Sequence, residues 1–221
     1  MKILSLDVSG NYSSIALLDG DEINTFTKTH ERKDRPEWND LFASINFDSS
    51  IDFETLDALA FARGPGSYTA LRITASFLKG IAVVKNLPLI PISNLHALAY
   101  EASQWIDAPD ASILVTLEAD QNESYFASYI KSPDGIAPLK EESVIAVSEL
   151  EVLAQTKSPR SFIAGTGWSQ STQEQDNFLS EVLTSAESIA ALAKIELLSG
   201  KSFDLESANP VYLKTPHYDK K

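Results

Sequence analysis

Residues 63–74, RGPGSYTALRIT, join two apolar segments through a short loop that is rich in glycine and hydroxyl side chains. The segment before this loop, LDALAFAR, has the length and apolar content of a buried strand. The segment after it, residues 68–85, has apolar residues at helical spacing. Gly64 and Gly66 permit backbone conformations that a Cβ forbids. The stretch is therefore predicted to turn a buried strand directly into a long helix.

The residue types of this loop leave two roles open. In the first, the loop only packs the strand closely against the helix, with Ser67 or Thr69 as the helix cap. In the second, free N–H groups at the helix N-terminus bind an anion such as a nucleotide phosphate. The sequence lacks the lysine of a P-loop, and Thr69 replaces the third glycine of a dinucleotide-binding fingerprint. A nucleotide or anion site here would comprise Asp7, Gly64, Gly66, Ser67 and Thr69.

The order of the remaining segments predicts the fold class. Three short apolar strands before residue 30 form a meander, and helices then alternate with strands up to about residue 105. This order is typical of a mixed β-sheet with helices on its faces. A similar order returns in the second half of the chain. We therefore expect an α/β protein of two lobes, residues 1–108 and 109–221, each with a mixed sheet flanked by helices.

Composition narrows the classes of function. The 221 residues include 18 Lys and Arg against 31 Asp and Glu, and the net charge of −13 disfavours binding of nucleic acid by this chain alone. No cysteine is present, which excludes disulfides and thiolate chemistry. The N-terminal apolar run is short and is broken by Asp7, so we expect neither a signal peptide nor a membrane span, and a cytoplasmic location.

Clusters of polar residues give little sign of catalysis. His30, His96 and His217 lie far apart in the sequence, so no metal site is expected. The acidic turn at residues 118–123 suits either acid–base chemistry or a solvated surface. A basic run suits either a solvated helix entrance or contact with a polar partner. This run comprises Lys28, Arg32, Lys33 and Arg35.

The predicted helix at residues 68–85 is apolar over an unusually large part of its circumference. At about 100° per residue, Leu71, Phe77 and Leu78 share one face, and only a narrow polar back remains. Such a helix needs cover on more than one side, which either the core of the same chain or a partner can supply. The candidate partner interface includes residues of the preceding predicted helix. It comprises Trp38, Leu41, Phe42, Leu71, Thr74, Phe77 and Leu78.

Residues 56–73, LDALAFARGPGSYTALRI, resemble the signature of the TsaB family, formerly called YeaZ. The likeness extends to Asp7 on the first strand and to the spacing of His30 and Pro36. It continues through the motifs LPLIPISNLHALA, GTGW at 165–168 and NPVYLK at 209–214. Together these motifs cover most of residues 1–130 and isolated stretches beyond.

The resemblance implies a two-lobed actin-like (ASKHA, ribonuclease H-like) fold. It implies a non-catalytic subunit that pairs with the transferase TsaD, or with itself, through helices at about 33–46 and 68–85. The product of that complex is N6-threonylcarbamoyladenosine at position 37 of tRNAs that read codons beginning with A. No cofactor of its own is implied, although ATP or ADP in the assembled complex, contact with TsaE, and contact with tRNA through the complex are compatible with the family.

Some residues depart from the family pattern, and one alternative function remains. Ala70 and Thr74 stand where glycine is common, and Asp34 and Arg35 replace a usually apolar pair, which indicates a more polar interface. The histidine motif that holds the metal of TsaD is absent. The alternative is an actin-like ATPase or small-molecule kinase that uses Asp7 and the Gly64–Thr69 loop. Asp7 can equally cap the turn that follows its strand.

Overall fold

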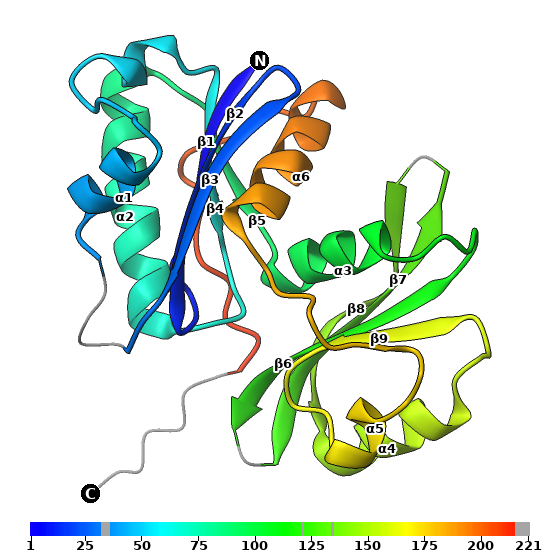
Figure 1. The fold of residues 1–221 in the computed structure, drawn as a ribbon. Helices are drawn as coiled ribbons and strands as arrows, with labels where there is room; N and C mark the ends of the chain where they lie inside the picture. The colour runs from blue at the N-terminus through cyan, green and yellow to red at the C-terminus, as the bar shows by residue number, and fades with distance from the viewer. Residues whose placement is uncertain (32–35, 121, 134, 215–221) are drawn as a thin grey trace, which may run out of the picture. The chain divides into compact units, whose positions relative to one another are not determined.

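The computed structural model describes residues 1–31, 36–120, 122–133 and 135–214 (Figure 1). The chain forms two compact units. Of the described residues, the first unit contains 1–97 and 184–210, and the second contains 98–183 and 211–214. Each unit is an α/β layer structure with its own five-stranded sheet.

The sheet of the first unit combines an antiparallel meander with two parallel strands. Its spatial order is β3-β2-β1-β4-β5, in which β2 pairs antiparallel with β1 and β3, while β4 is parallel to β1 and β5. All five strands overlap segments that the sequence predicts as strands. The strands are β1 (Lys2–Asp7), β2 (Tyr12–Asp19), β3 (Glu22–Thr29), β4 (Ala58–Ala62) and β5 (Leu89–Ile92).

Helices cover both faces of this sheet (Figure 1). On one face, Leu6 and Phe61 of the sheet share a core with Leu41 of α1 and Leu78 of α2. On the other face, α6 contacts β1, β2, β4 and β5. The helical elements of the unit are α1 (Trp38–Ser44), the 3₁₀ helix η2 (Asp52–Thr55), α2 (Tyr68–Lys85) and α6 (Ala186–Leu198).

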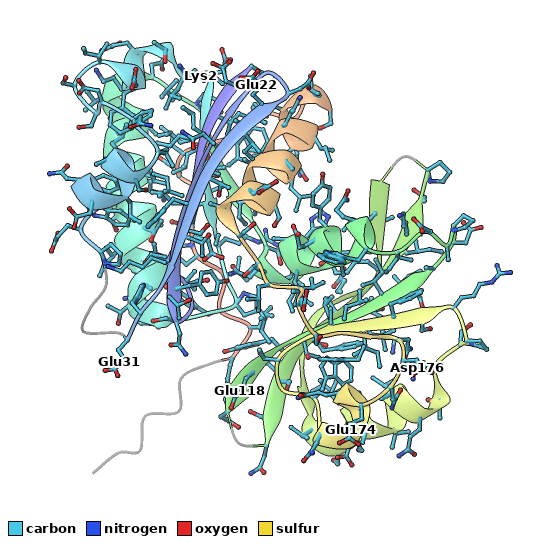
Figure 2. All side chains as sticks on the ribbon, in the orientation of Figure 1. Lys2, Glu22, Glu31, Glu118, Glu174 and Asp176 are labelled. Carbon is cyan, nitrogen blue, oxygen red and sulfur yellow. The ribbon has the colours of Figure 1, made fainter. Side chains whose placement is uncertain are left out.

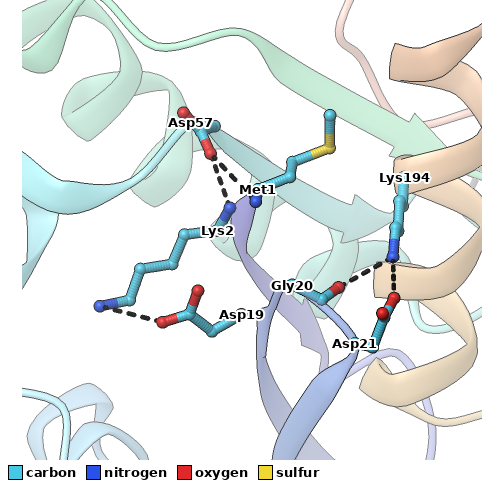
Figure 3. A network of polar contacts seen from close by, with 7 residues as sticks. All are labelled: Met1, Lys2, Asp19, Gly20, Asp21, Asp57 and Lys194. Carbon is cyan, nitrogen blue, oxygen red and sulfur yellow. Dashed lines mark hydrogen bonds and ion pairs between the residues drawn. The ribbon is translucent and has the colours of Figure 1, made fainter.

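The turn of the β2–β3 hairpin is held in place by polar contacts (Figure 3). Lys194 Nζ of α6 donates to the Gly20 carbonyl at 2.8 Å and to Asp21 Oδ1 at 2.9 Å. On the strand just before the turn, Asp19 Oδ2 lies 3.8 Å from Lys2 Nζ of β1. These contacts fix where β3 starts and therefore its register against β2.

The second unit repeats the topology of the first. Its sheet order, β8-β7-β6-β9-β10, places an antiparallel meander beside parallel strands in the same sequence of pairings. The helix α3 contains the division between the units, and α4 and α5 belong to the second. The elements are α3 (Asn94–Gln104), β6 (Ser112–Asp120), β7 (Glu123–Ser132), β8 (Gly135–Ala146), α4 (Val147–Thr156), β9 (Ser161–Gly165), α5 (Gln170–Gln173) and β10 (Phe178–Leu179).

This repeated arrangement confirms the predicted α/β class with two lobes, each built on a mixed sheet. The division between lobes differs from the predicted boundary at residue 108, because the chain returns to the first unit at Thr184. The reason is physical: the apolar side of α6, including Ile189 and Leu192, is buried in covering the free face of the first sheet. Within the described residues, no helix is long and apolar enough to cross a membrane.

Some sequence-based expectations fall on residues that lie outside the described part of the chain. They concern Arg32, Lys33, Asp34, Arg35 and His217.

The burial of one side of α6 predicts that two isoleucines of this helix contribute very differently to the free energy of unfolding. Ile189→Ala should lower the free energy of unfolding by about 2–5 kcal/mol, because it opens a cavity in a fully buried site. Ile195→Ala, at a position that is 49% exposed, should change it by less than about 0.5 kcal/mol. Urea unfolding followed by circular dichroism measures both values, and equal effects would contradict the placement of α6.

Candidate functional site

Asp7 ends β1 in a fully buried position and is surrounded by hydrogen-bond donors. Its Oδ1 accepts from the Ser9 amide at 3.0 Å and from Ser9 Oγ at 2.6 Å. Its Oδ2 accepts from the Tyr12 hydroxyl at 3.1 Å, and that hydroxyl also contacts Thr184 Oγ1. Both carboxylate oxygens therefore already have partners within the chain.

Tyr12 completes this polar cluster as a donor. Burial, and after it the neighbouring Asp7 carboxylate, raise the pKa of the Tyr12 hydroxyl well above its ordinary value of 10.0. The hydroxyl thus keeps its proton over the whole neutral range and continues to donate to the Asp7 carboxylate.

The glycine loop after β4 lies directly against the same cluster. A Cβ on Gly66 would lie 2.8 Å from the Ser9 Cβ, which is closer than real Cβ contacts occur, and 3.0 Å from the Ser9 carbonyl oxygen, which is tighter than most. The Ser67 amide donates to that Ser9 carbonyl at 2.8 Å. Gly64 has a φ of +111°, a conformation that favours glycine. Close packing is thus the role of the loop that the geometry supports.

Asn94, at the start of α3, joins the loop to the Asp7 cluster. Its Nδ2 donates to Ser9 Oγ at 2.7 Å, and its Oδ1 accepts from the Gly64 amide at 2.8 Å. The Asn94 amide donates in turn to the Gly64 carbonyl at 2.9 Å. Sequence reasoning missed Asn94, although its place in the motif LPLIPISNLHALA was the available signal.

The structure brings together the residues predicted as a nucleotide or anion site. Gly66 and Thr69 are exposed there, and the Ser67 hydroxyl makes no cap hydrogen bond to α2. The amides of Gly64 and Ser67, however, are used by Asn94 and Ser9. Anion binding at this loop therefore stays a prediction, with part of its donor set already used by the chain.

The predicted partner interface is mostly core. Five of its seven side chains are buried in the first unit, so they offer no surface to a partner. They are Leu41, Phe42, Leu71, Thr74 and Leu78. The orientation of α2 against the sheet is the reason, because Leu71 and Leu78 both point into the chain's own interior. Trp38 and Phe77 remain half-buried and stack with ring centroids 4.5 Å apart.

The exposed side of α2 carries a narrow apolar stripe. Ile73, Phe77 and Val84 lie within about 40° of one another around the helix axis, given 100° per residue. Ile73 is 45% exposed and Val84 is 79% exposed. Gly80 lies between them on the same line, with open space around it. We call Ile73, Phe77 and Val84 the α2 stripe. Ile73 and Val84 are thus the exposed part of the apolar face of α2.

Beside the α2 stripe lies an aromatic hollow between α1 and α2. Its volume is about 350 Å³, and its walls combine stacked and edge-on rings with a polar rim. It is lined by Glu37, Trp38, Asn39, Phe42, Ser49, Phe53, Phe77 and Ile81. Stripe and hollow share Phe77, so they form one continuous surface on the first unit.

The acidic turn between β6 and β7 is tied to the C-terminal segment. Lys214, in the motif NPVYLK, forms ion pairs with Asp120 and Glu123. Through its hydrogen bond, Lys214 lowers the pKa of Asp120 below its ordinary value of 3.8. Glu118 is joined through its amide to Thr166 Oγ1 at 2.9 Å. The turn thus has a structural role in holding the chain's end, and acid–base chemistry has no support from its geometry.

The histidines do not come together in the described part of the chain. His30 Nε2 contacts Ser13 Oγ at 2.7 Å at the end of β3, whereas His96 is half-buried near Arg63 and Glu196. Burial lowers the pKa of His96 to about 4. Among the described residues, no group of three or more His, Cys, Asp or Glu is placed to hold a metal ion.

Comparison with known proteins identifies the family. A family model described as TsaD: tRNA N6-adenosine threonylcarbamoyltransferase matches residues 28–205. The tRNA threonylcarbamoyladenosine biosynthesis protein TsaB of Haemophilus influenzae is 30% identical, over 97% of this chain and 94% of that protein. The Escherichia coli protein of the same name is 28% identical, over 97% and 95%. The chain belongs to the TsaB family.

A solved structure agrees with this assignment. YeaZ from Pseudomonas aeruginosa superposes with a TM-score of 0.77 at 26% identity, covering 96% of this chain and 99% of that one. The motif GTGW begins at Gly165, the last residue of β9. A Cβ on Gly165 would lie 2.0 Å from the Thr116 carbonyl oxygen, so β9 lies very close to the middle of β6 at this point.

The close approach of Gly66 to Ser9 predicts that two Gly→Ala substitutions change the stability of the protein in opposite directions. Gly66→Ala should destabilise the protein by about 1–3 kcal/mol, because the new Cβ must displace Ser9. Gly80→Ala should stabilise it by roughly 0.5–1 kcal/mol, since nothing lies within 4 Å and alanine favours the helix. Chemical denaturation of the two variants measures both changes. Stabilisation by Gly66→Ala would contradict the packing described.

Burial of His96 predicts a pH dependence of stability. Its pKa falls from 6.5 to about 4 on folding, so the unfolded chain binds the proton more readily and stability is lost as the pH falls through this range. The loss should reach on the order of 3 kcal/mol near pH 4. Urea titrations at pH 7.5, 5.5 and 4.5 should show a steeper decline for the natural protein than for His96→Gln. Parallel curves would contradict the burial of a neutral His96.

Proposed function

We propose that this TsaB-family chain acts in tRNA threonylcarbamoyladenosine biosynthesis as a non-catalytic subunit that pairs with TsaD. The modified base would be adenosine 37 of tRNAs that read ANN codons. In this proposal tRNA is reached only through the complex, which agrees with the chain's net charge of −13. The names of the full-length relatives support the pathway, and the family model supports the kinship with TsaD.

The observation that carries the pairing is the surface formed by the α2 stripe and the aromatic hollow. Exposed apolar side chains that adjoin a hollow are typical of protein–protein contacts. The stacked pair Trp38 and Phe77 forms a rigid aromatic centre, and such residues often dominate binding energy. The polar rim, with Glu37 and Asn39, suits a contact whose partners also exist alone.

The hydrogen bonds that the Asp7 carboxylate already accepts within the chain support a role without catalysis. In open α/β sheets, ligands bind at the carboxyl ends of the strands, where Asp7 and the glycine loop lie. Here the Asp7 carboxylate accepts three hydrogen bonds within the chain and is fully buried. A metal–phosphate group would have to displace Ser9 or Tyr12 to reach it. In this proposal, any ATP or ADP therefore binds only in the assembled complex.

The α2 stripe predicts which substitutions separate the partners. The double variant Ile73→Glu/Val84→Glu should weaken binding to TsaD by at least about tenfold, because two charges would enter an apolar contact. Light scattering of mixtures with TsaD from the same organism measures the association. Leu71 and Leu78 are unsuitable for this test because they are buried and would report on folding.

A matched control keeps that experiment specific. Val152→Glu changes a side chain that is 58% exposed on α4 of the second unit and should leave binding intact. Circular dichroism should show that all variants are folded. Unchanged binding by the folded double variant would reject the α2 stripe as the contact, and absence of any complex would reject the pairing itself.

The alternative of an ATPase or kinase gives a second prediction. The isolated chain with Mg²⁺ and ATP should release no phosphate above the buffer rate, because the buried Asp7 carboxylate already accepts three hydrogen bonds within the chain. A malachite-green phosphate assay measures the release. Turnover by the isolated chain that disappears in folded Asp7→Asn would favour the enzyme and contradict the proposal.

A further inference from the structure

The aromatic hollow between α1 and α2 has one charged side chain among the residues that line it, the carboxylate of Glu37. Figure 2 shows α1 and α2 with their side chains on the face of the first sheet that α6 does not cover. The rings of Trp38 and Phe77 stack with their planes 5° apart, and Phe42 meets Phe53 edge-on at 5.6 Å. The hollow therefore offers aromatic surface beside a negative charge.

The polar rim of the hollow carries hydrogen-bond acceptors. Glu37 is exposed and is the N-cap residue of α1, but its side chain makes no cap hydrogen bond to that helix. Asn39 is also exposed at the rim and adds an amide oxygen. These two acceptors favour an occupant that donates hydrogen bonds.

The chain segment that forms one side of the hollow is strongly acidic. Residues 37–57, which contain α1 and η2, include six Asp and Glu and no Lys or Arg. Glu54 forms an ion pair with Lys85 of α2. Hydrogen bonds from Ser50 hold the pKa of Asp48 below its ordinary value of 3.8, so this carboxylate stays charged at neutral pH. The charge of this segment therefore attracts a cation to the hollow.

The basic side chains of α2 are already bound elsewhere. Lys79 Nζ donates to Asn209 Oδ1 at 2.6 Å, and Lys85 is held by the ion pair described above. The guanidinium of Arg72 lies 4.0 Å from the centre of the Tyr68 ring, in the first turns of the helix. None of these three cations is among the residues that line the hollow.

We propose that the hollow receives an arginine side chain of TsaD, whose guanidinium stacks on the Trp38 ring and donates hydrogen bonds to the Glu37 carboxylate. This inference rests on the proposed pairing with TsaD and names one of its contacts. Phe77 belongs both to the hollow and to the α2 stripe, so a partner that covers the stripe also reaches the hollow.

Arginine fits this hollow better than the other side chains that could enter it. Its guanidinium is planar, stacks on aromatic rings, binds a carboxylate through two hydrogen bonds and is more weakly hydrated than the ammonium of lysine. Among aromatic side chains, tryptophan attracts a cation most strongly. An apolar side chain would instead cover the Glu37 carboxylate without giving it a partner, which costs free energy.

A binding experiment on the isolated chain tests the chemistry of the hollow. The three tryptophans give three indole N–H signals in a ¹⁵N NMR spectrum, and Trp38→Phe identifies the signal of Trp38. Nα-acetylarginine N-methylamide should shift that signal with a Kd on the order of 10 mM. The citrulline analogue has nearly the same shape without the charge and should leave the signal in place. Glu37→Gln should weaken binding of the arginine probe about threefold.

Isothermal titration calorimetry with TsaD from the same organism tests the source of the arginine. Glu37→Gln should weaken binding on the order of tenfold and reduce its salt dependence, because the guanidinium loses its charged partner. Glu174→Gln removes the same charge from the exposed surface of the second unit (Figure 2) and should change the affinity by less than about twofold.

Two substitutions of Trp38 separate ring stacking from filling of space. Trp38→Leu should weaken binding of TsaD on the order of tenfold, because it removes the aromatic face. Trp38→Phe keeps an aromatic ring and should retain the affinity to within about threefold. Circular dichroism should show that both variants are folded.

Three results would overturn the proposal, and they differ from one another. An arginine probe that shifts the Trp38 signal no more than the citrulline analogue would show that the hollow does not select a cation. Unchanged binding of TsaD by Glu37→Gln would assign the hollow to an apolar side chain of TsaD and leave the pairing intact. Absence of binding between the natural chain and TsaD, with the arginine probe still bound, would reject the pairing and with it TsaD as the source of the arginine.

Discussion

The backbone contact between Gly66 and Ser9 sets the geometry of the first unit. At this point the loop after β4 lies so close to the end of β1 that no Cβ fits between them. The Ser9 carbonyl accepts a hydrogen bond from the loop, and the Ser9 hydroxyl accepts one from Asn94. The amide and the hydroxyl of Ser9 both donate to the Asp7 carboxylate. Two strands and the starts of two helices thus meet in one small polar cluster. In the second unit a glycine again allows a close approach to the central strand, with Gly165 of β9 against Thr116 of β6.

This contact also determines what α2 exposes. The Ser67 amide is bound to Ser9, so the helix begins at a fixed place and with a fixed rotation about its axis. Leu71 and Leu78 are then directed into the core, and Ile73 and Val84 are left outside. The apolar surface that supports pairing is therefore a consequence of how the glycine loop packs. A family signature centred on that loop is understandable in these terms, because the loop positions a surface several turns away.

The sequence alone predicts the class of fold. It does not predict how α2 is rotated about its axis, which sheet α6 covers, or which residues pair with Lys214. The three short apolar segments before residue 30 predict the β-meander, because the local pattern of apolar residues is enough to identify short strands. The rotation of α2 is not a local property: its apolar residues cover more than half the circumference, and only the sheet decides which of them point inward. The return of α6 to the first sheet, and the pairing of Lys214 with Asp120 and Glu123, join residues far apart in the chain, and no spacing rule predicts such contacts.

The groups of the first unit that are free to contact another molecule lie on its surface and not at the strand ends. The carboxyl ends of β1 and β4, where ligands of open α/β sheets usually bind, are filled by hydrogen bonds between Asp7, Ser9 and the glycine loop. Buried donors and acceptors that already satisfy one another are costly to separate, so a ligand would have to replace all of these bonds. The α2 stripe has no such competition, because its exposed side chains Ile73 and Val84 lie outside the core of the first unit. A contact made there would leave the Asp7 cluster and the interior of the unit unchanged.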